Sequence, residues 1–431
     1  MSVDQAVIAP SGIHNPGNFC YIISSLQCLK HLNPLKEYFN DCGPLDEKYT
    51  DIMSAIGLHN PVGKAEMQNI VKREIALLKS GNEEKFANVK EKYKMSRDEL
   101  EWFLGKIFTE NTKIYLYIVT RELLRTINIR GLTVNPMGFL RICRQVFNDF
   151  GMGHLCDGNQ NDAQEFLTVL IDYLHDSHSI PTKTNIPKAI LDLSESELDA
   201  NPDIKERIKC GLYKEITTRY GNGVSTIYKQ MYFYNLNQIL CSKCRFSALN
   251  YCPNNILCVP TDTLTDQSKR MVDMGLNPNV GGTTIYDCLD AFFCEEKLDG
   301  DYACNKCKNK SDMIMKRHMI TMPKTLIISL KRFVFNPQSG GLYKNNIQID
   351  YPLLLDVSKY SPIEHTKSET TQYRLIGVVN HSGALNFGHY YSYNSIGGVW
   401  WCHNDGRVFQ IKESDVICNN QNAYILFYEQ L

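Results

Sequence analysis

The sequence predicts an α+β fold in which helical and strand patterns occupy different parts of the chain. Apolar residues follow Cys20 at helical spacing, and this pattern ends before Asn33-Pro34. A charged, helix-favouring region extends from about residue 45 to residue 130. Near the other end, alternating and apolar residues from Gln372 onward indicate strands separated by glycine-containing turns.

The composition is typical of a folded, globular chain. Of its 431 residues, 43% are hydrophobic and 22% are charged, and the formal net charge is -1. Without a strong overall charge, we expect neither nucleic acid nor a membrane surface as a partner. The N-terminal residues lack the pattern of a secretory signal, and no apolar run is long enough to span a bilayer. We therefore expect a cytoplasmic or nuclear protein, or both. In a reducing compartment its 16 cysteines serve as thiols and metal ligands rather than disulfides.

Cys20 is predicted to be the first residue of a helix. There the unpaired backbone N–H groups and the helix dipole favour a thiolate, and the same donors can stabilise an oxyanion. Asn15 lies five residues upstream, across a Pro16-Gly17 turn, so that its side-chain amide can fold back as a further oxyanion donor. The alternatives are that Cys20 is a small buried residue and that Asn-Pro-Gly-Asn is only a turn.

His389 begins a strand-like Tyr-Tyr-Ser-Tyr run after Gly388. The glycine removes a side chain where a substrate could pass, and a Gly-Gly turn further on returns the chain so that Asn404 and Asp405 come alongside His389. Either residue could orient the imidazole. If each motif is considered alone, the favoured interpretation is that His389 is an ordinary strand histidine and that Asn404-Asp405 forms only a turn. Together with Cys20 they form a nucleophile, a base and an orienting group in the order of a thiol protease.

A set of ordered motifs from Gly12 to Tyr428 closely resembles the ubiquitin-specific protease family of deubiquitinases. The matching segments are Asn15-Pro16-Gly17-Asn18-Phe19-Cys20-Tyr21, Ser25-Leu26-Gln27-Cys28-Leu29, Gln160-Asn161-Asp162-Ala163-Gln164-Glu165-Phe166-Leu167, Leu330-Lys331-Arg332-Phe333, the segments around His389 and Asn404, and Ala423-Tyr424-Ile425-Leu426-Phe427-Tyr428. The resemblance implies a papain-like α+β fold with thumb, palm and fingers. It implies one catalytic domain over residues 1–431, in which 12–210 are mainly thumb, 211–325 mainly zinc-bearing fingers and 326–431 mainly palm.

By the same resemblance, the protein is expected to hydrolyse the peptide or isopeptide bond after the C-terminal glycine of ubiquitin through an acyl-enzyme. Cys20 is then the nucleophile, His389 the general base and later acid, and Asn404 the orienting residue. Asn15 is an oxyanion donor. Asp405 is expected to share the orienting role, because a carboxylate stabilises imidazolium better than an amide does.

The position before the nucleophile departs from the family. It is usually a small Thr or Ala there and is Phe19 here, so that the ring is expected to narrow the cleft. The family's second motif binds the ubiquitin tail. By this resemblance, Asp162 and Glu165 are expected to bind the basic and polar groups of the tail. Helix capping is the alternative for these acids, because they lie in the first turn of a predicted helix. Tyr390 is expected to pack over the tail.

Two Cys-x-x-Cys pairs, Cys241 with Cys244 and Cys304 with Cys307, predict a closed tetrahedral site for a structural zinc ion. One such pair is unremarkable in a chain with 16 cysteines, but two in the interval where the family carries its finger zinc are specific. Redox use is the minor alternative, because no βαβ pattern surrounds them. The remaining cysteines of this region are assigned to packing: Cys252, Cys258, Cys288 and Cys294.

The expected partners are ubiquitin and ubiquitinated proteins. Because the motifs extend over nearly the whole chain, we expect a bare catalytic core whose targets are selected by surface insertions or by a separate regulatory subunit. One alternative is a ubiquitin-binding scaffold without turnover. The intact set of Cys20, His389 and Asn404 argues against this alternative. The other is a protease for a different ubiquitin-like modifier, and the sequence does not discriminate between the modifiers.

Overall fold

The computed structural model describes residues 9–33, 35–36, 39, 43–58, 64–129, 131–179, 190, 192–201, 203–220, 223–261, 283–298, 303–310, 312–336, 340–361, 370–384, 387–418 and 421–431. The chain forms two compact units. The first contains Met1–Ser179, Ser225–Ile227 and Asp405–Val408, and the second contains Ile180–Val224, Tyr228–Asn404 and Phe409–Leu431. The predicted finger and palm segments thus lie largely within one unit. In the part of the chain that is described, no helix has both the length and the apolar character needed to cross a bilayer.

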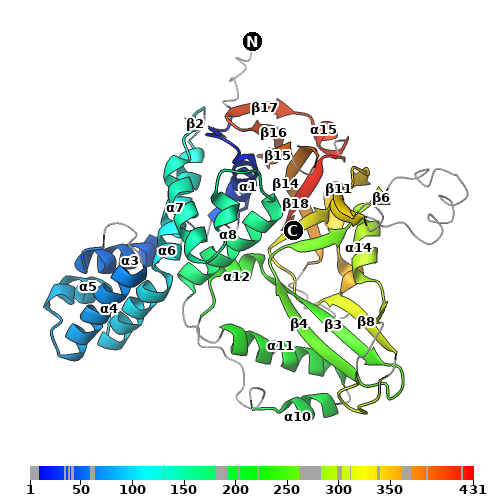
Figure 1. Ribbon diagram of the computed structural model, residues 1–431, viewed down its shortest axis with the longest axis horizontal. Helices are drawn as coiled ribbons and strands as arrows, with labels where there is room; N and C mark the ends of the chain where they lie inside the picture. Colours follow the sequence, from blue (N-terminus) through cyan, green and yellow to red (C-terminus); the bar gives the residue numbers. More distant parts are fainter. Residues whose placement is uncertain are drawn as a thin grey trace, which may run out of the picture. The chain divides into compact units, whose positions relative to one another are not determined.

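The first unit is mainly helical (Figure 1). Its helices are α1 (Cys20–His31), α3 (Gly43–Ala55), α4 (Lys64–Lys79), α5 (Ala87–Tyr93), α6 (Arg97–Ile127), α7 (Met137–Asp149) and α8 (Ala163–His178), with short 3-10 turns η1 (Glu84–Phe86) and η2 (Gly153–Cys156). The helix predicted to begin at Cys20 and to end before Asn33-Pro34 is therefore confirmed.

Helices α3 to α6 form a helical subregion with its own core, which includes Tyr49, Phe86 and Leu104. Helix α6 begins with a capping box: Ser96 Oγ accepts from the Glu99 backbone N–H, and Glu99 accepts from the Ser96 N–H. The helix-favouring character predicted for residues 45 to 130 is thus confirmed.

Helix α1 is buried along its whole length. Tyr21 fixes its first turn, because its hydroxyl donates to the Leu155 carbonyl at 2.6 Å and its ring meets the edge of Phe166 on α8. Just upstream, β1 (Gly12–Ile13) pairs in parallel with β2 (Thr133–Val134). A side chain at Gly12 would be impossible without movement, since its Cβ would lie 2.5 Å from the Gly406 carbonyl oxygen. These contacts set the position of the segment that leads to Cys20.

The second unit contains an eight-stranded sheet. Its strands are β5 (Leu257–Pro260), β9 (Thr325–Lys331), β13 (Leu354–Asp356), β14 (Gln372–Gly383), β15 (Gly388–Ile396), β16 (Val399–Asn404), β17 (Arg407–Ile411), of which residues 409–411 belong to this unit, and β18 (Ala423–Gln430). The order is β17-β16-β15-β14-β18-β9-β5, with β13 beside β14. The predicted strands and the turn at Gly397-Gly398 are confirmed, and β14 continues to Gly383.

The core of this sheet contains apolar side chains of β9, β14 and β18 together with α14 (Ile285–Phe293). Arg332, from the Leu-Lys-Arg-Phe motif, is fully buried beside it and donates to the carbonyls of Ala423, Asn345 and Ile347. A buried guanidinium is tolerated when its donors are satisfied in this way. Short elements complete the unit: α15 (Glu413–Cys418), η3 (Ser358–Tyr360), the hairpin of β10 (Phe333–Asn336) and β11 (Gly341–Lys344), and the parallel pair of β6 (Thr283–Thr284) and β12 (Ile349–Asp350).

A smaller sheet has the order β4-β3-β8-β7, formed by β3 (Phe233–Cys241), β4 (Ser247–Asn254), β7 (Glu296–Leu298) and β8 (Met313–Met319). Helix α11 (Ile204–Tyr220) packs on it through Ile208 and Leu212 against Tyr234 and Leu236. The helix lies beside β4 (Figure 1). Two short helices lie before and after α11 in the chain: α10 (Glu195–Ala200) and α12 (Thr226–Met231), the latter divided between the two units.

Candidate active site and metal centre

Cys20 is the first residue of α1 and is 4% exposed. The N-cap residue, Phe19, has no polar side chain that could accept from the first N–H groups of the helix. Uncapped N–H donors at a helix start favour a negative charge. The local structure therefore suits a thiolate or an oxyanion at this position.

Asn15 has a defined orientation in the first unit. Its Oδ1 accepts from the backbone N–H groups of Gly17 and Phe19, at 3.1 and 3.2 Å. Its Nδ2 lies 3.3 Å from both carboxylate oxygens of Asp405. Because two backbone donors require the oxygen on one side, the amide nitrogen faces Asp405.

The contact between Asp405 and Asn15 was not anticipated from the sequence, which grouped Asp405 with Asn404 around His389. Asp405 has a φ of +52°, unusual for a residue with a side chain, and its carbonyl accepts from the Ile13 N–H at 3.1 Å. Such backbone conformations persist where surrounding contacts hold them. Asp405 thus holds the segment of the first unit that carries Asn15, through both its side chain and its carbonyl.

His389 and Asn404 meet in the second unit. The predicted hairpin return brings them together, with His389 Nε2 2.7 Å from Asn404 Oδ1. Since an amide oxygen only accepts, Nε2 carries the proton in the neutral ring and Nδ1 carries the lone pair. Asn404 therefore selects one tautomer of the imidazole.

His381 was missed by the sequence analysis. It lies on β14 opposite Tyr390 and is 4% exposed. A Cβ on Gly388 would lie 2.2 Å from His381 Nε2, so this glycine makes room for a neighbouring imidazole, where the sequence had suggested a passing substrate. Burial lowers the pKa of His381 to about 4, and the positive charges of Lys344 and His389 act in the same direction. No sequence pattern links His381 to Gly388, because the contact arises from strand pairing.

The three predicted substrate contacts also have partners within their own units. Asp162 is the N-cap of α8 and accepts from the backbone N–H groups of Gln164 and Glu165, which is the capping alternative. Glu165 is exposed and lies 3.3 Å from His154 Nε2. Tyr390 is 5% exposed and packs on His381 and Tyr424.

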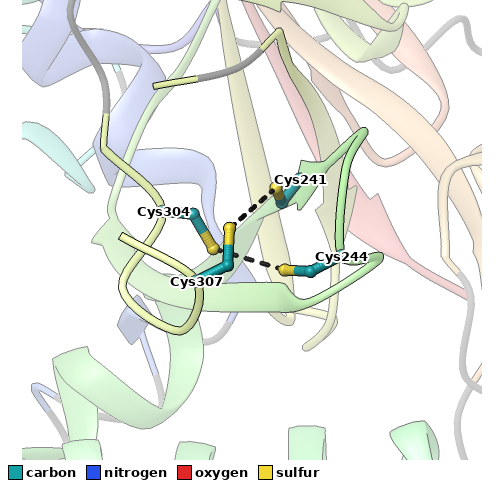
Figure 2. Close-up of side chains that lie close together, drawn as sticks. All are labelled: Cys241, Cys244, Cys304 and Cys307. Atoms are coloured by element: carbon teal, nitrogen blue, oxygen red, sulfur yellow. Dashed lines mark hydrogen bonds between the residues drawn. The ribbon is translucent and has the colours of Figure 1, made fainter. Parts of the chain in front are cut away.

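The four predicted metal ligands, Cys241, Cys244, Cys304 and Cys307, form one cluster in the second unit (Figure 2). Their sulfur atoms all lie within 4.8 Å of one another, with 4.0 Å between Cys241 and Cys307 and 3.6 Å between Cys244 and Cys304. A tetrahedral ion with metal–sulfur bonds of about 2.3 Å separates its ligands by about 3.8 Å. The cluster can therefore hold a metal ion with four sulfur ligands.

The two cysteine turns have the same backbone construction. Arg245 follows the first pair with a φ of +58° and donates to the Cys241 carbonyl, and Lys308 follows the second with a φ of +56° and donates to the Cys304 carbonyl. The backbone N–H of Asn309 is the main reason that the pKa of Cys307 is lowered. At Cys244 the Phe246 N–H lowers the pKa, but burial and hydrogen bonds with neighbouring thiols raise it to about 11. Without a cation, the cluster thus does not favour four thiolates.

The other cysteines of this region differ in burial. Cys288 belongs to the core, and Cys252 and Cys258 are half-buried, in keeping with the packing role that was predicted. Cys294 is exposed, so the prediction is wrong there. It follows Phe293 at the end of α14, where the chain leaves the core.

Comparison with known proteins identifies the family. The family model described as ubiquitin carboxyl-terminal hydrolase matches residues 11–428. A probable ubiquitin carboxyl-terminal hydrolase of Acanthamoeba polyphaga mimivirus is 26% identical, over 97% of this chain and 89% of that protein. Ubiquitin carboxyl-terminal hydrolase 4 of Eremothecium gossypii is 26% identical over 73% of this chain, which corresponds to 35% of that longer protein. Human ubiquitin carboxyl-terminal hydrolase 21 is 25% identical over 69% of this chain and 49% of its own length.

Solved structures show the same fold. The yeast SAGA DUB module of Ubp8, Sgf11, Sus1 and Sgf73, bound to monoubiquitin, contains a chain that matches 100% of this one with a TM-score of 0.56, at 20% identity and over 72% of that chain. A second structure of the module, with ubiquitin aldehyde, gives the same TM-score of 0.56. The α+β, papain-like fold predicted from the motifs is thereby confirmed. Because the family match spans nearly the whole sequence, this protein belongs to the ubiquitin carboxyl-terminal hydrolase family, as a deubiquitinase of the ubiquitin-specific protease type.

Proposed function

We propose that this protein uses Cys20, His389 and Asn404 to hydrolyse the peptide or isopeptide bond after the C-terminal glycine of ubiquitin. The observation that carries the proposal is the 2.7 Å hydrogen bond between His389 Nε2 and Asn404 Oδ1. It selects the tautomer whose Nδ1 can accept a proton, as a general base requires. The family match and the position of Cys20 at the start of α1 support the thiol as its partner.

The reaction proceeds through a thioester. His389 Nδ1 takes the proton of the Cys20 thiol, and the thiolate attacks the carbonyl carbon of the terminal glycine. His389 then gives the proton to the departing amine as the carbon–nitrogen bond breaks. A water molecule, deprotonated by His389, attacks the thioester and releases ubiquitin with a free carboxylate and Cys20 as thiol. Asn404 keeps the imidazole in one orientation in both halves.

The oxyanion of each tetrahedral intermediate is stabilised by backbone N–H groups of the first turn of α1 and by the Asn15 side chain. Asn15 Nδ2 carries two hydrogens, so it can donate to Asp405 and to an oxyanion at the same time. We assign Asp405 to the orientation of Asn15 because of the two 3.3 Å contacts between them. Orientation of the imidazole is assigned to Asn404.

The substrate is ubiquitin attached to another protein. The start of α8 offers carboxylates to the basic tail of ubiquitin, and Glu165 is the better placed of the two acids because its side chain is 47% exposed. Asp162 acts mainly by holding the helix start, and Tyr390 supports the strand pairing behind His389. The structural neighbour lies in a module with three further proteins, which supports a regulatory subunit for this chain as well.

We also propose zinc as the metal of the cysteine cluster. Four thiolates in two tight turns form a closed set that suits zinc and leaves no position for a substrate. Zinc bound there would supply positive charge and cross-link the two turns. Its role is therefore structural.

The test is hydrolysis of ubiquitin that carries a C-terminal fluorogenic amide, with wild type and Cys20→Ser compared. Cys418→Ser serves as a matched control, because Cys418 is exposed. We expect turnover by wild type and by the control, and none by Cys20→Ser. An electrophilic ubiquitin probe should label wild type at Cys20, as mass spectrometry of the digest would report.

Three results would overturn the proposal in whole or in part. Turnover by Cys20→Ser at the wild-type rate would exclude this thiol as the nucleophile. Binding of ubiquitin without turnover by wild type would indicate a scaffold. Turnover of a different ubiquitin-like modifier with a higher kcat/KM would change the substrate and leave the chemistry unaltered.

A further inference from the structure

A groove of about 680 Å³ lies in the first unit beside the candidate nucleophile. Its walls are the turn at residues 16–19 and helix α7, and it reaches Cys156, the last residue of η2, and Gly158, which follows η2 in the chain. Phe19 is part of the wall and directly precedes Cys20, so the groove begins one residue, about 3.8 Å along the chain, from the nucleophile. We call it the α7 groove. Its volume is that of a ligand site for several side chains.

The walls of the α7 groove are held by hydrogen bonds. Asn18 Nδ2 donates to the Gly158 carbonyl at 3.1 Å, which ties the turn before Cys20 to the segment after η2. Arg144 on α7 donates through Nε to the Cys156 carbonyl at 2.9 Å and through its guanidinium to the Asp157 carbonyl. The groove is therefore built by three separate segments that are bonded to one another, so its shape does not depend on a bound ligand.

Phe19 gives the groove an apolar wall. A Cβ on Gly158 would lie 3.9 Å from the tip of the Phe19 ring and 3.7 Å from the Arg144 guanidinium, so the ring and the cation lie on the same side of that glycine. Met137 adds an apolar side chain that is 52% exposed. The bulky residue that departs from the family pattern is thus part of a surface that an apolar side chain could cover.

The groove is positively charged. Arg141 and Arg144 line it, and none of the described lining residues is acidic. Within the described part of the chain, Arg141 has no carboxylate partner, and Arg144 donates to the carbonyl oxygens of Cys156 and Asp157. The Asp157 carboxylate is engaged by the backbone N–H and side chain of Asn159, which are the main reasons that its pKa is lowered, and the charge of Arg144 acts in the same direction. It offsets only part of the charge of the two guanidiniums.

The charge indicates which side of the scissile bond the groove serves. The ubiquitin tail is basic and is assigned above to the acids at the start of α8, so two guanidiniums would repel it. The leaving side carries the protein from which ubiquitin is removed. An extended chain advances about 3.3 Å per residue, so residues within a few positions of the modified lysine can reach a groove next to Cys20.

We propose that the α7 groove binds an acidic segment of the ubiquitinated target protein, within a few residues of the modified lysine, with an apolar side chain against Phe19. Arg141 and Arg144 bind its carboxylates. The groove thereby makes the target side of the bond a determinant of specificity. This inference rests on the proposed function, because it names the leaving group of that reaction.

The test uses ubiquitin joined through its C-terminal glycine to the lysine side chain of short fluorescein-labelled peptides. The lysine is flanked by acids, by the corresponding amides or by arginines, and each of these peptides carries one phenylalanine. A further acidic peptide carries alanine in place of the phenylalanine. The quantity measured is the ratio of kcat/KM values for acidic and amide peptides, in which general effects on the enzyme cancel. Wild type should prefer the acidic peptide by about tenfold, as expected for two exposed charge pairs.

Variants of Arg141 should change that ratio. Arg141→Gln should lower it to about threefold, and Arg141→Glu should abolish it and favour the arginine peptide. Phe19→Ala should reduce the preference for phenylalanine over alanine within the acidic peptide. The matched control is Arg125→Gln on α6, whose side chain is 47% exposed outside the groove, and it should retain the wild-type ratio.

The proposal is overturned if wild type cleaves the acidic, amide and arginine peptides equally, or if Arg141→Glu keeps the wild-type ratio. It is also overturned if peptides show no preference while Arg141→Glu slows cleavage of ubiquitin dimers, because the occupant would then be a second ubiquitin. Fluorescence anisotropy, which measures binding of the conjugates to Cys20→Ser, tests the groove separately from the proposed function. Arg141-dependent binding without turnover by wild type would support the groove and contradict the proposed function. Turnover without a charge preference would do the opposite.

Discussion

The cysteine cluster and the two candidate catalytic pairs are both compact polar sites, but they differ in what completes them. Each cysteine turn takes its shape from its own backbone, yet the four sulfur atoms of the two turns lie within 4.8 Å of one another, and the described cluster consists of thiols alone. In contrast, His389 with Asn404 and Asn15 with Asp405 satisfy one another by side-chain hydrogen bonds.

Because of this difference, we expect substitutions in the cysteine cluster to change stability and substitutions in the catalytic pairs to change the reaction rate. A bound metal ion would complete the cysteine cluster, because four thiols can all ionise together only next to a cation. The candidate catalytic pairs are held by hydrogen bonds between their own side chains, as in preorganised sites. Loss of a cysteine ligand should therefore destabilise the second unit, whereas loss of a catalytic partner should slow the reaction and leave the fold intact.

The largest effect is expected for His389→Ala. Without a general base, kcat/KM for a fluorogenic ubiquitin substrate should fall by about 10³-fold or more. The melting temperature should change by less than about 2 °C, because both the His389 side chain and its partner Asn404 are only half-buried, so that Asn404 can reach water. Kinetics and thermal melting of the same preparation would check both. Wild-type turnover by this variant would exclude His389 as the base.

Cys304→Ser should have the next largest effect, but on stability and ubiquitin binding more than on the rate of the chemical step. Loss of one thiolate should release the metal, lower the melting temperature by about 5–10 °C and raise KM by about 10²-fold with a smaller change in kcat. The metal content, KM and kcat of the variant are measured and compared with those of wild type. Cys294→Ser, outside the cluster and exposed, is the control. A metal-free variant with wild-type KM would show that the cluster does not support ubiquitin binding.

Acidification should destabilise both units through one buried histidine in each. Burial is the main cause that lowers the pKa of His175 and of His381 to about 4, from an ordinary 6.5. Above pH 6.5 both the folded and the unfolded chain hold them neutral, so their full contribution to stability is present. As the pH falls from 6.5 to 4 the unfolded chain binds more protons, and each histidine should lower the unfolding free energy by about 2 kcal/mol between pH 7 and pH 5.

His381→Gln and His175→Gln test this pH dependence separately, because glutamine does not titrate. Each variant should flatten the decline between pH 7 and pH 5 in denaturant melts, whatever its stability at pH 7. Other charged groups also act on these two pKa values. They are Lys344 and His389 for His381, and Asp176, Lys106 and Lys113 for His175. An unchanged decline in both variants would assign the acid sensitivity to other groups.

The smallest effect is expected for Asp405→Asn. If Asp405 acts by orienting Asn15, kcat should fall by about fivefold with KM unchanged, and Asn15→Ala should cost more, because it removes the donor itself. Adding Asp405→Asn to Asn15→Ala should then have no further effect, since the two residues act as one unit. Multiplying effects in the double variant would instead indicate that Asp405 acts on another group.

The sequence predicted much of this molecule because the relevant patterns are local. Helix α1 follows from the apolar spacing after Cys20, and the hairpin that joins His389 to Asn404 follows from one turn between two strands. The cysteine turns are local in the same sense. Each needs only two ligands three positions apart and a residue that accepts a positive φ. Ordered motifs from Gly12 to Tyr428 then connected these parts to one family, and the family model matches residues 11–428.

Only the tertiary structure decided contacts between distant segments. Asn15 and Asp405 are 390 residues apart, and no local pattern distinguishes the partner of Asp405 from that of its neighbour Asn404. The space above Gly388 is filled by His381 because β14 and β15 pair in one register, and a different register would leave it open. The α7 groove likewise exists because the Phe19 turn and the Gly158 segment are tied together across the unit. Local sequence determines which hydrogen bonds a segment can make with itself, whereas packing of helices and sheets determines which segments meet.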